Sequence, residues 1–268
     1  MKKKLIYSIA ALIVGILLLS QEPQINSKLA TAACKQAGKM FGTRPLDPQQ
    51  EEKIRAIAHK MNIQETIVIR KANASALQGL GYYNAFMYFP AFLKFIPTNA
   101  PAHLFVSEGF FEDLSQEEQL FLIGHELIHI KKRHTKYIHL AYWLLLCLFV
   151  LFWWRIQKRL KLFFRNFIHP KRFSFALRCI QAIVLYVCVA IPNLSYLAYR
   201  RHMERIADKQ SIEILSSYDG ALKLIDRWQN EYHLPENKRL FGLLADHPLH
   251  EERKNYCLAL KKQFEGTA

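Results

Sequence analysis

Residues 115–134 read SQEEQLFLIGHELIHIKKRH, and this stretch decides the fold because it predicts a metal-binding helix. Its first four residues form the S-x-x-E pattern of a capping box, which predicts that a helix begins there. His125 and His129 are four residues apart on one face of that helix, so both imidazoles can reach one zinc ion. Glu126 lies between them, where a carboxylate can take a proton from water that the metal activates. The stretch therefore predicts a catalytic zinc site.

The predicted site needs one more protein ligand, because a catalytic zinc ion is held by three protein side chains and keeps a fourth position open. Spacing favours Glu204. Two apolar stretches of similar length follow His129 and precede Glu204. If both are helices that run antiparallel, they return Glu204 to the level of His129. Asp208 comes four residues later and lies on the same face of its helix.

Other interpretations of these polar residues stay open. Glu204 and Asp208 could form an ordinary solvated helix face that pairs with neighbouring arginines. His202 is a rival ligand, although on a helix it points about 160° away from Glu204. His134 is expected to be structural, because on a continuous helix it lies on the side opposite His125.

The region before the motif predicts one helix and a small sheet. Residues 47–61 have Pro48 near the first turn and apolar side chains on one face, as expected of a helix. Three β-type runs follow at 66–70, 82–89 and 102–106, separated by Gly and Pro. We therefore expect an α+β fold that is mainly α, with a small antiparallel sheet ahead of the zinc-binding helices.

Two uncharged stretches, 137–154 and 179–199, are long enough as helices to cross a bilayer and predict a transmembrane hairpin. A buried helical hairpin in a soluble protein is the alternative. Residues 127–203 contain Lys and Arg but no Asp or Glu, and basic flanks of this kind suit anionic lipid. The Lys and Arg residues of 127–203 account for much of the net charge of +15. Nucleic acid is not an expected partner, because no nucleic-acid-binding motif accompanies the charge.

The predicted organisation has five segments. Residues 1–20 form a signal anchor or a signal peptide, and 21–46 form a tether. Residues 47–136 are the first part of the catalytic domain, 137–199 are the transmembrane hairpin with its basic loop, and 200–268 are the second part. The hairpin is thus inserted between the helices that carry the metal ligands. Basic residues at the N-terminus and in the hairpin loop predict that both are cytoplasmic. The catalytic domain of this multi-pass protein is then expected on the exoplasmic or periplasmic side of the cell (inner) membrane.

Further positions match one family of enzymes in chain order. They are 84–86 (NAF), 105–109 (FVSEG), the H-E-x-x-H-I-x-x-x-H pattern ending at His134, the E-x-x-A-D pattern from Glu204 to Asp208, His247-Pro248 and Arg253. Over roughly residues 50 to 260, the sequence resembles the HtpX-like and CAAX prenyl protease-like membrane zinc metallopeptidases, which are of the gluzincin type.

The resemblance implies roles for several residues. Glu204 would be the third zinc ligand and Asp208 an adjacent carboxylate, while the strand with Asn84 would be an edge along which the substrate backbone lies. Apart from the resemblance, two interpretations of His247 stay open: it could be part of a simple turn before Pro248, or it could hydrogen-bond the oxyanion or occupy the open zinc position in a resting state. The expected orientation departs from the HtpX-like relatives, which have two spans before the zinc helix and act on the cytoplasmic side.

These observations together predict a membrane-bound zinc metalloendopeptidase with one Zn²⁺ per chain. Its substrates would be proteins or peptides, and its role would be processing or quality control of membrane or envelope proteins at the lipid bilayer. A catalytically silent membrane adaptor that retains the peptidase fold is the alternative. The predicted metal ligands are His125, His129 and Glu204, and the predicted catalytic residues are Glu126, Asp208 and His247.

Overall fold

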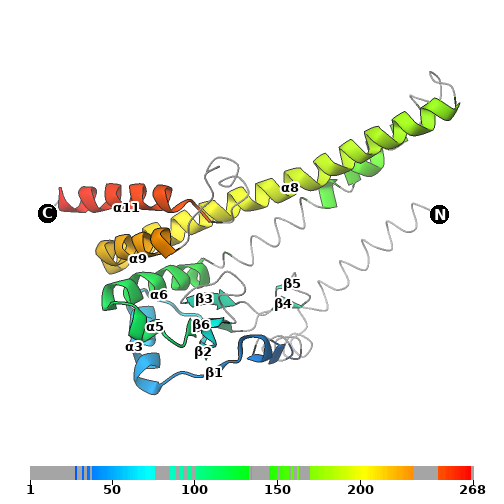
Figure 1. The fold of residues 1–268 in the computed structure, drawn as a ribbon. Helices are drawn as coiled ribbons and strands as arrows, with labels where there is room; N and C mark the ends of the chain where they lie inside the picture. Colours follow the sequence, from blue (N-terminus) through cyan, green and yellow to red (C-terminus); the bar gives the residue numbers. More distant parts are fainter. Residues whose placement is uncertain are drawn as a thin grey trace. The chain divides into compact units, whose positions relative to one another are not determined.

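The computed structural model contains two compact units. One boundary between them, between Glu204 and Arg205, falls inside a long helix. Unit 1 comprises residues 1–136, 205–233 and 250–268, and unit 2 comprises 137–204 and 234–249 (Figure 1). The structure describes residues 28, 32, 35–36, 38–75, 85–88, 91–92, 96–97, 101–132, 134, 145, 147–149, 151–156, 158–159, 162, 170–231 and 247–266.

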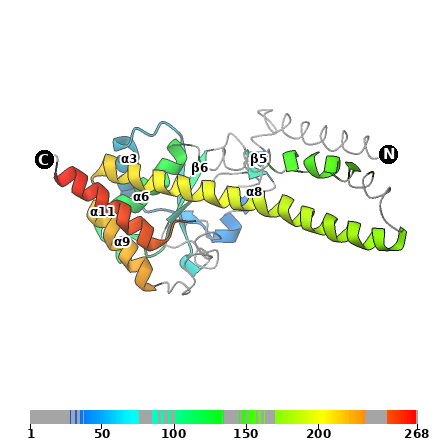
Figure 2. The ribbon, with the colours of Figure 1, turned by 90° about the horizontal axis from the view of Figure 1, so that it is seen from above.

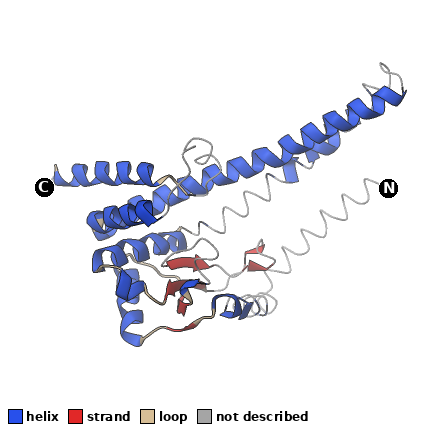
Figure 3. Cartoon of the chain, in the orientation of Figure 1, coloured by secondary structure: helices blue, strands red, loops and turns tan. Residues whose placement is uncertain are grey.

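Unit 1 contains a four-stranded sheet in the order β1-β2-β6-β3 (Figure 3). Its strands are β1 (Arg44–Pro45), β2 (Ile67–Ala72), β3 (Ala85–Tyr88) and β6 (Ala102–Ser107). A separate pair is formed by β4 (Ala91–Phe92) and β5 (Ile96–Pro97). All six side chains of β6 are buried, in agreement with its central place in the sheet. The three strands predicted from the sequence are confirmed as β2, β3 and β6.

The sheet is mixed, so the prediction of an antiparallel sheet is wrong for one pair of strands. β2 and β6 run parallel, with Ile67 opposite Ala102 and Ala72 opposite Ser107, whereas β3 runs antiparallel to β6. Parallel neighbours need a long connection, and here the chain passes through β3, β4 and β5 between them. Alternation of apolar residues indicates which face a side chain occupies, but it does not indicate strand direction.

Two helices of unit 1, α3 and α6, begin where the sequence predicts. Asp47 caps α3, and its carboxylate accepts hydrogen bonds from the backbone N–H groups of Gln49 and Gln50. Ser115 and Glu118 form the predicted capping box of α6, since each side chain accepts from the backbone of the other. The described helices of unit 1 include α3 (Pro48–Lys60), α5 (Phe110–Asp113), α6 (Gln116–Lys131), α9 (Tyr218–Glu231), α11 (His250–Glu265) and residues 205–215 of α8 (Pro170–Leu215).

Helix α6 is the central helix of unit 1. It contacts α3, β3 and α9, and α9 in turn lies beside α11 (Figures 1 and 2). Residues 121–128 of α6 are all buried, among them His125 and Glu126 of the H-E-x-x-H motif, and His129 is half-buried. The apolar core joins residues of the sheet to α6, α8 and α9, for example Leu104, Leu127 and Ile212. A core on several sides of α6 holds the motif in a fixed position.

Unit 2 contains residues 170–204 of α8 and shorter described stretches of helix between residues 145 and 162. Among the described residues, no helix is both long enough and apolar enough to cross a membrane. Part of the predicted span 137–154 lies outside the described residues. The transmembrane hairpin therefore stays a prediction. Several large apolar side chains of unit 2 are exposed: Leu148, Leu151, Phe152, Leu162, Ile183, Tyr186, Val187, Ile191 and Leu194.

Candidate metal centre

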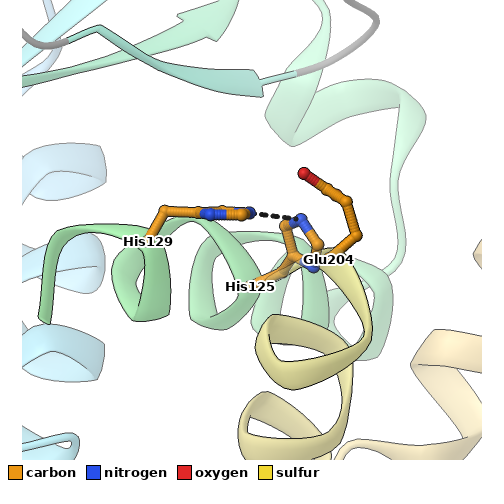
Figure 4. A group of neighbouring side chains, drawn as sticks. All are labelled: His125, His129 and Glu204. Atoms are coloured by element: carbon orange, nitrogen blue, oxygen red, sulfur yellow. Dashed lines mark hydrogen bonds between the residues drawn. The ribbon is translucent and has the colours of Figure 1, made fainter. Parts of the chain in front are cut away.

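Three potential metal ligands come together from two helices. His125 and His129 belong to α6, and Glu204 belongs to α8, one residue before the part of that helix assigned to unit 1. One ligand atom from each residue lies within 4.8 Å of the others. Figure 4 shows the two imidazoles directed toward one another and the Glu204 carboxylate reaching toward them. The predicted triad is thus assembled, while its role as a metal site remains a proposal.

The spacing of the two imidazoles fits a tetrahedral metal ion. The Nε2 atoms of His125 and His129 are 3.1 Å apart. Two nitrogens bound to one tetrahedral zinc at about 2.0–2.1 Å are separated by about 3.3 Å. Glu204 supplies the carboxylate that would complete a His₂Glu ligand set, one of the sets found in catalytic zinc sites. The donor set and the spacing therefore fit zinc.

Each imidazole is oriented by a partner at its other ring nitrogen. The Nδ1 atom of His125 lies 2.7 Å from Oδ1 of Asp208. Because the carboxylate accepts, Nδ1 carries the proton and the lone pair of Nε2 is available to a metal. The Nδ1 atom of His129 lies 3.0 Å from Nδ1 of His134, and this pair can hold a proton on His129 Nδ1 in the same way. Outer partners of this kind fix the ring orientation of metal-binding histidines.

The placement of His134 differs from the prediction that it lies on the side of the helix opposite His125. That prediction assumed a continuous helix, but α6 ends at Lys131 and Lys132 is its C-cap. The buried ring of His134 consequently packs edge-to-face against His129, with ring centroids 5.0 Å apart. Helical spacing therefore gave the wrong side for this residue, which contacts a candidate ligand.

Asp208 is fully buried and accepts hydrogen bonds from three other side chains. Arg253 donates through Nε to Oδ2 at 2.9 Å and through a terminal nitrogen to Oδ1 at 2.6 Å. The Tyr256 hydroxyl also donates to Oδ2. Burial alone would raise the pKa of the Asp208 carboxyl, but the Arg253 charge and the hydrogen bonds from His125 and Arg253 hold this pKa well below its usual range. Asp208 is therefore an ionised carboxylate at neutral pH.

His247 lies beside the third candidate ligand. Its Nδ1 atom is 3.0 Å from Oε2 of Glu204, and its side chain is about half exposed. An imidazole so close to a candidate ligand is near enough to interact with a molecule bound at the metal.

Rival ligands are less well placed than the triad. His202 is exposed, whereas Glu204, two residues later on α8, is buried. Cys257 lies near Asp208, but burial and the Asp208 charge raise the pKa of its thiol to about 12. A thiol with such a pKa stays protonated at neutral pH, and metals bind the thiolate. Glu126 is buried on α6 directly after His125, as a proton acceptor at this site requires.

A glycine sets the close approach of the two ligand-bearing helices. A Cβ atom at Gly124 would lie 2.4 Å from Leu215 Cδ1 and 2.4 Å from Ser211 Oγ, so a larger residue would force these two side chains of α8 to move. The Ser211 hydroxyl also donates to the carbonyl oxygen of Phe121 at 3.0 Å. Because Gly124 precedes His125, this contact fixes the helices where Asp208 meets the first histidine.

The sequence matches the profile of Peptidase family M48 over residues 48–259. This range includes the two candidate histidine ligands, Glu204 and the residues around Asp208. The chain belongs to peptidase family M48. Family M48 comprises metallopeptidases, and the convergence of His125, His129 and Glu204 agrees with that chemistry.

The fold is similar to that of a protein of known structure, Ste24p. The crystal structure of Ste24p from S. mikatae aligns with a TM-score of 0.55 and 14% sequence identity. The alignment covers 96% of this chain and 64% of the Ste24p chain, so this M48 chain spans less than two thirds of that protein's length. A search of curated proteins gives no significant match. The predicted resemblance to HtpX-like and CAAX prenyl protease-like enzymes is confirmed at the level of the M48 family.

Two contributors to this M48 site have no role predicted from the sequence. Arg253 belongs to the family pattern without an assigned role, and no sequence pattern distinguishes Tyr256. Both lie on α11, more than forty residues after Asp208 in the chain. α11 and α8 are too far apart in the sequence for residue spacing to predict that they meet. The contacts of Arg253 and Tyr256 with Asp208 are therefore seen only in the tertiary structure.

Proposed function

We propose that this M48 protein is a membrane-bound zinc metalloendopeptidase that holds one Zn²⁺ through His125, His129 and Glu204. The observation that carries the proposal is the convergence of these three ligand atoms within 4.8 Å. The orientation of His125 by the buried Asp208 carboxylate supports it, because an unliganded surface cluster does not need a fixed ring tautomer.

The residues of the chain have distinct roles in the proposed reaction. When bound, zinc would acidify a water molecule and polarise the peptide carbonyl. Glu126 accepts a proton from the attacking water and delivers it to the nitrogen of the departing amine. Asp208 keeps the proton on Nδ1 of His125. His247 donates a hydrogen bond to the oxygen that becomes negative in the transition state.

The substrate is proposed to bind as an added strand. β3 is the last strand of the described sheet, next to β6, and it contacts α6, which carries the H-E-x-x-H motif. An extended peptide that pairs with such a strand gains backbone hydrogen bonds that do not depend on its sequence. A peptidase that uses this mode cuts unfolded or extended segments in preference to folded ones.

The proposed site of action is the membrane. The exposed apolar side chains of unit 2 include Phe152, Ile183 and Tyr186. Many large apolar side chains exposed on helices are typical of a surface that contacts lipid or another apolar partner. Basic residues flank the same region in the sequence. We place the catalytic residues on the exoplasmic side and assign the enzyme to processing or quality control of membrane or envelope proteins.

Zinc content tests the metal centre. Full-length protein purified in detergent should contain about one zinc per chain, as expected for a site with three protein ligands. Elemental analysis gives this ratio, and a casein-type unfolded substrate gives the hydrolytic activity. A chain that lacks zinc after purification in zinc-containing buffer would exclude the proposed enzyme. A chain that binds zinc without hydrolysing any unfolded protein would support the silent adaptor instead.

Thiol labelling in intact cells tests the proposed orientation. Lys262→Cys and Arg159→Cys replace exposed residues of unit 1 and unit 2, respectively. A membrane-impermeant maleimide should label Lys262→Cys and leave Arg159→Cys unlabelled, because α11 is placed outside and the basic loop inside. The parent chain gives the background of the native cysteines, and detergent lysis should expose both positions. The reverse pattern in intact cells would place the active site in the cytoplasm.

A further inference from the structure

One residue from each of four helices forms a connected chain of side chains behind His125. His125 on α6 meets Asp208 on α8, and Asp208 meets Arg253 on α11. The guanidinium of Arg253 lies over the ring of Trp228 on α9, 5.1 Å from its centroid. All four residues belong to unit 1. The orientation of a candidate metal ligand is therefore linked to α11.

The carboxylate of Asp208 uses its full capacity to accept hydrogen bonds. A carboxylate has about four lone-pair sites, two on each oxygen. Oδ1 accepts from His125 and Arg253, and Oδ2 accepts from Arg253 and Tyr256. With every site occupied, the carboxylate has no free direction in which to rotate. Its Oδ1 atom is thereby held in line with Nδ1 of His125.

The two donors on α11 differ in what they supply. Arg253 provides a positive charge beside a buried carboxylate and binds both oxygens through adjacent nitrogens, a geometry that fixes the plane of the carboxylate. Tyr256 provides only a hydroxyl, on the oxygen that does not face His125. Removal of the Arg253 charge would leave Asp208 unpaired in the core, whereas removal of the Tyr256 hydroxyl changes a single hydrogen bond.

We propose that Tyr256 and Arg253 are positioning residues that act through Asp208 to hold His125 in its metal-binding orientation. The inference rests on the proposed metal site. It extends that site to α11, which supplies no metal ligand in the proposal. Loss of one donor to Asp208 should loosen the carboxylate and, through it, the direction of the His125 Nε2 lone pair.

Helix α11 has other attachments that keep it in place without the Tyr256 hydroxyl. Lys254 pairs with Asp226 and Lys261 pairs with Asp219 on α9, each at 2.7 Å. Leu260 is buried in the core. The effect of Tyr256→Phe on the metal centre can therefore be separated from an effect on the fold.

Cobalt binding to the full-length chain tests the inference, because Co²⁺ reports its own coordination by visible absorption. Tyr256→Phe should weaken Co²⁺ binding about 10-fold, at the lower end of the range for loss of an outer-shell partner. It should also alter the absorption band at saturating Co²⁺ and lower kcat for peptide hydrolysis with little change in KM. The thermal unfolding midpoint of the metal-free chain should stay close to that of the wild type.

Tyr218→Phe is the matched control. The ring of Tyr218 lies on α9 and packs against Phe264 of α11 at 5.6 Å between centroids, away from Asp208. The same loss of a hydroxyl there should leave Co²⁺ affinity and the absorption band unchanged. Arg253→Lys keeps the charge but loses the two-nitrogen contact, and should weaken Co²⁺ binding more than Tyr256→Phe does.

The outcomes separate this inference from the proposed function. If the wild-type chain binds Co²⁺ and Tyr256→Phe binds it with the same affinity and spectrum, Tyr256 has no positioning role and the inference is wrong. If the wild-type chain binds no Co²⁺, the proposed metal site fails and the inference fails with it. An unfolded Arg253→Lys variant would not affect the decision, which depends on Tyr256→Phe and its control.

Discussion

Glu126→Gln is expected to keep the fold and the bound zinc while it lowers peptide hydrolysis at least about 100-fold, the usual contribution of a general base. The amide has nearly the same shape as the carboxylate but does not accept a proton from water. Glu126 is buried in α6 between the two histidines, so its replacement should not disturb their contacts. Turnover of an unfolded substrate is measured on protein with verified zinc content.

Glu117→Gln is the matched control for this experiment. It makes the same chemical change on the same helix, at an exposed residue whose carboxylate pairs with Lys223. Hydrolysis should be unchanged, because a surface ion pair contributes little to stability and lies away from the histidines. Equal turnover in zinc-loaded Glu126→Gln and wild-type protein would remove Glu126 from the mechanism.

Glu204→Ala is expected to weaken zinc binding by more than about 100-fold, which exceeds the loss typical of an outer-shell partner. The substitution removes the carboxylate that completes the three-ligand set and also the contact with His247. Zinc affinity is measured by competition with a chelator of known affinity. Unfolding of the metal-free variant should resemble that of the metal-free wild type, because no ligand bond contributes in either protein.

His202→Ala on the same helix is the control for the third ligand. His202 is exposed, two residues before Glu204, and on a helix it points away from it. Its removal should leave zinc affinity nearly unchanged. A strong loss in His202→Ala together with normal binding in Glu204→Ala would mean that the ligand has been assigned to the wrong residue.

The parts of the site that are close in sequence could be predicted from it. The capping box at Ser115 places the start of α6, and the spacing of His125 and His129 then determines that they share a face. Glu204 could be proposed because two stretches of equal length return the chain to its starting level. Each of these predictions depends on the regular rise and turn of a helix.

The parts that depend on tertiary packing could not be predicted. β2 and β6 pair in parallel, but the alternation of apolar and polar residues along a strand does not indicate the direction of its neighbour. The end of α6 at Lys131 brings His134 against His129, although helical spacing places it elsewhere. Tyr256 is an ordinary residue of an amphipathic helix until α11 is docked beside Asp208.

The attachment of α11 to Asp208 has a consequence for the order of events during synthesis. α11 leaves the ribosome after α6, α8 and α9, so Arg253 and Tyr256 reach Asp208 only when those helices already exist. Until then, His125 lacks the fully bonded carboxylate that holds its tautomer. A nascent chain would thus carry both histidines and Glu204 without an aligned metal centre. In the proposed mechanism, hydrolysis would therefore begin only after α11, the last described helix, has docked.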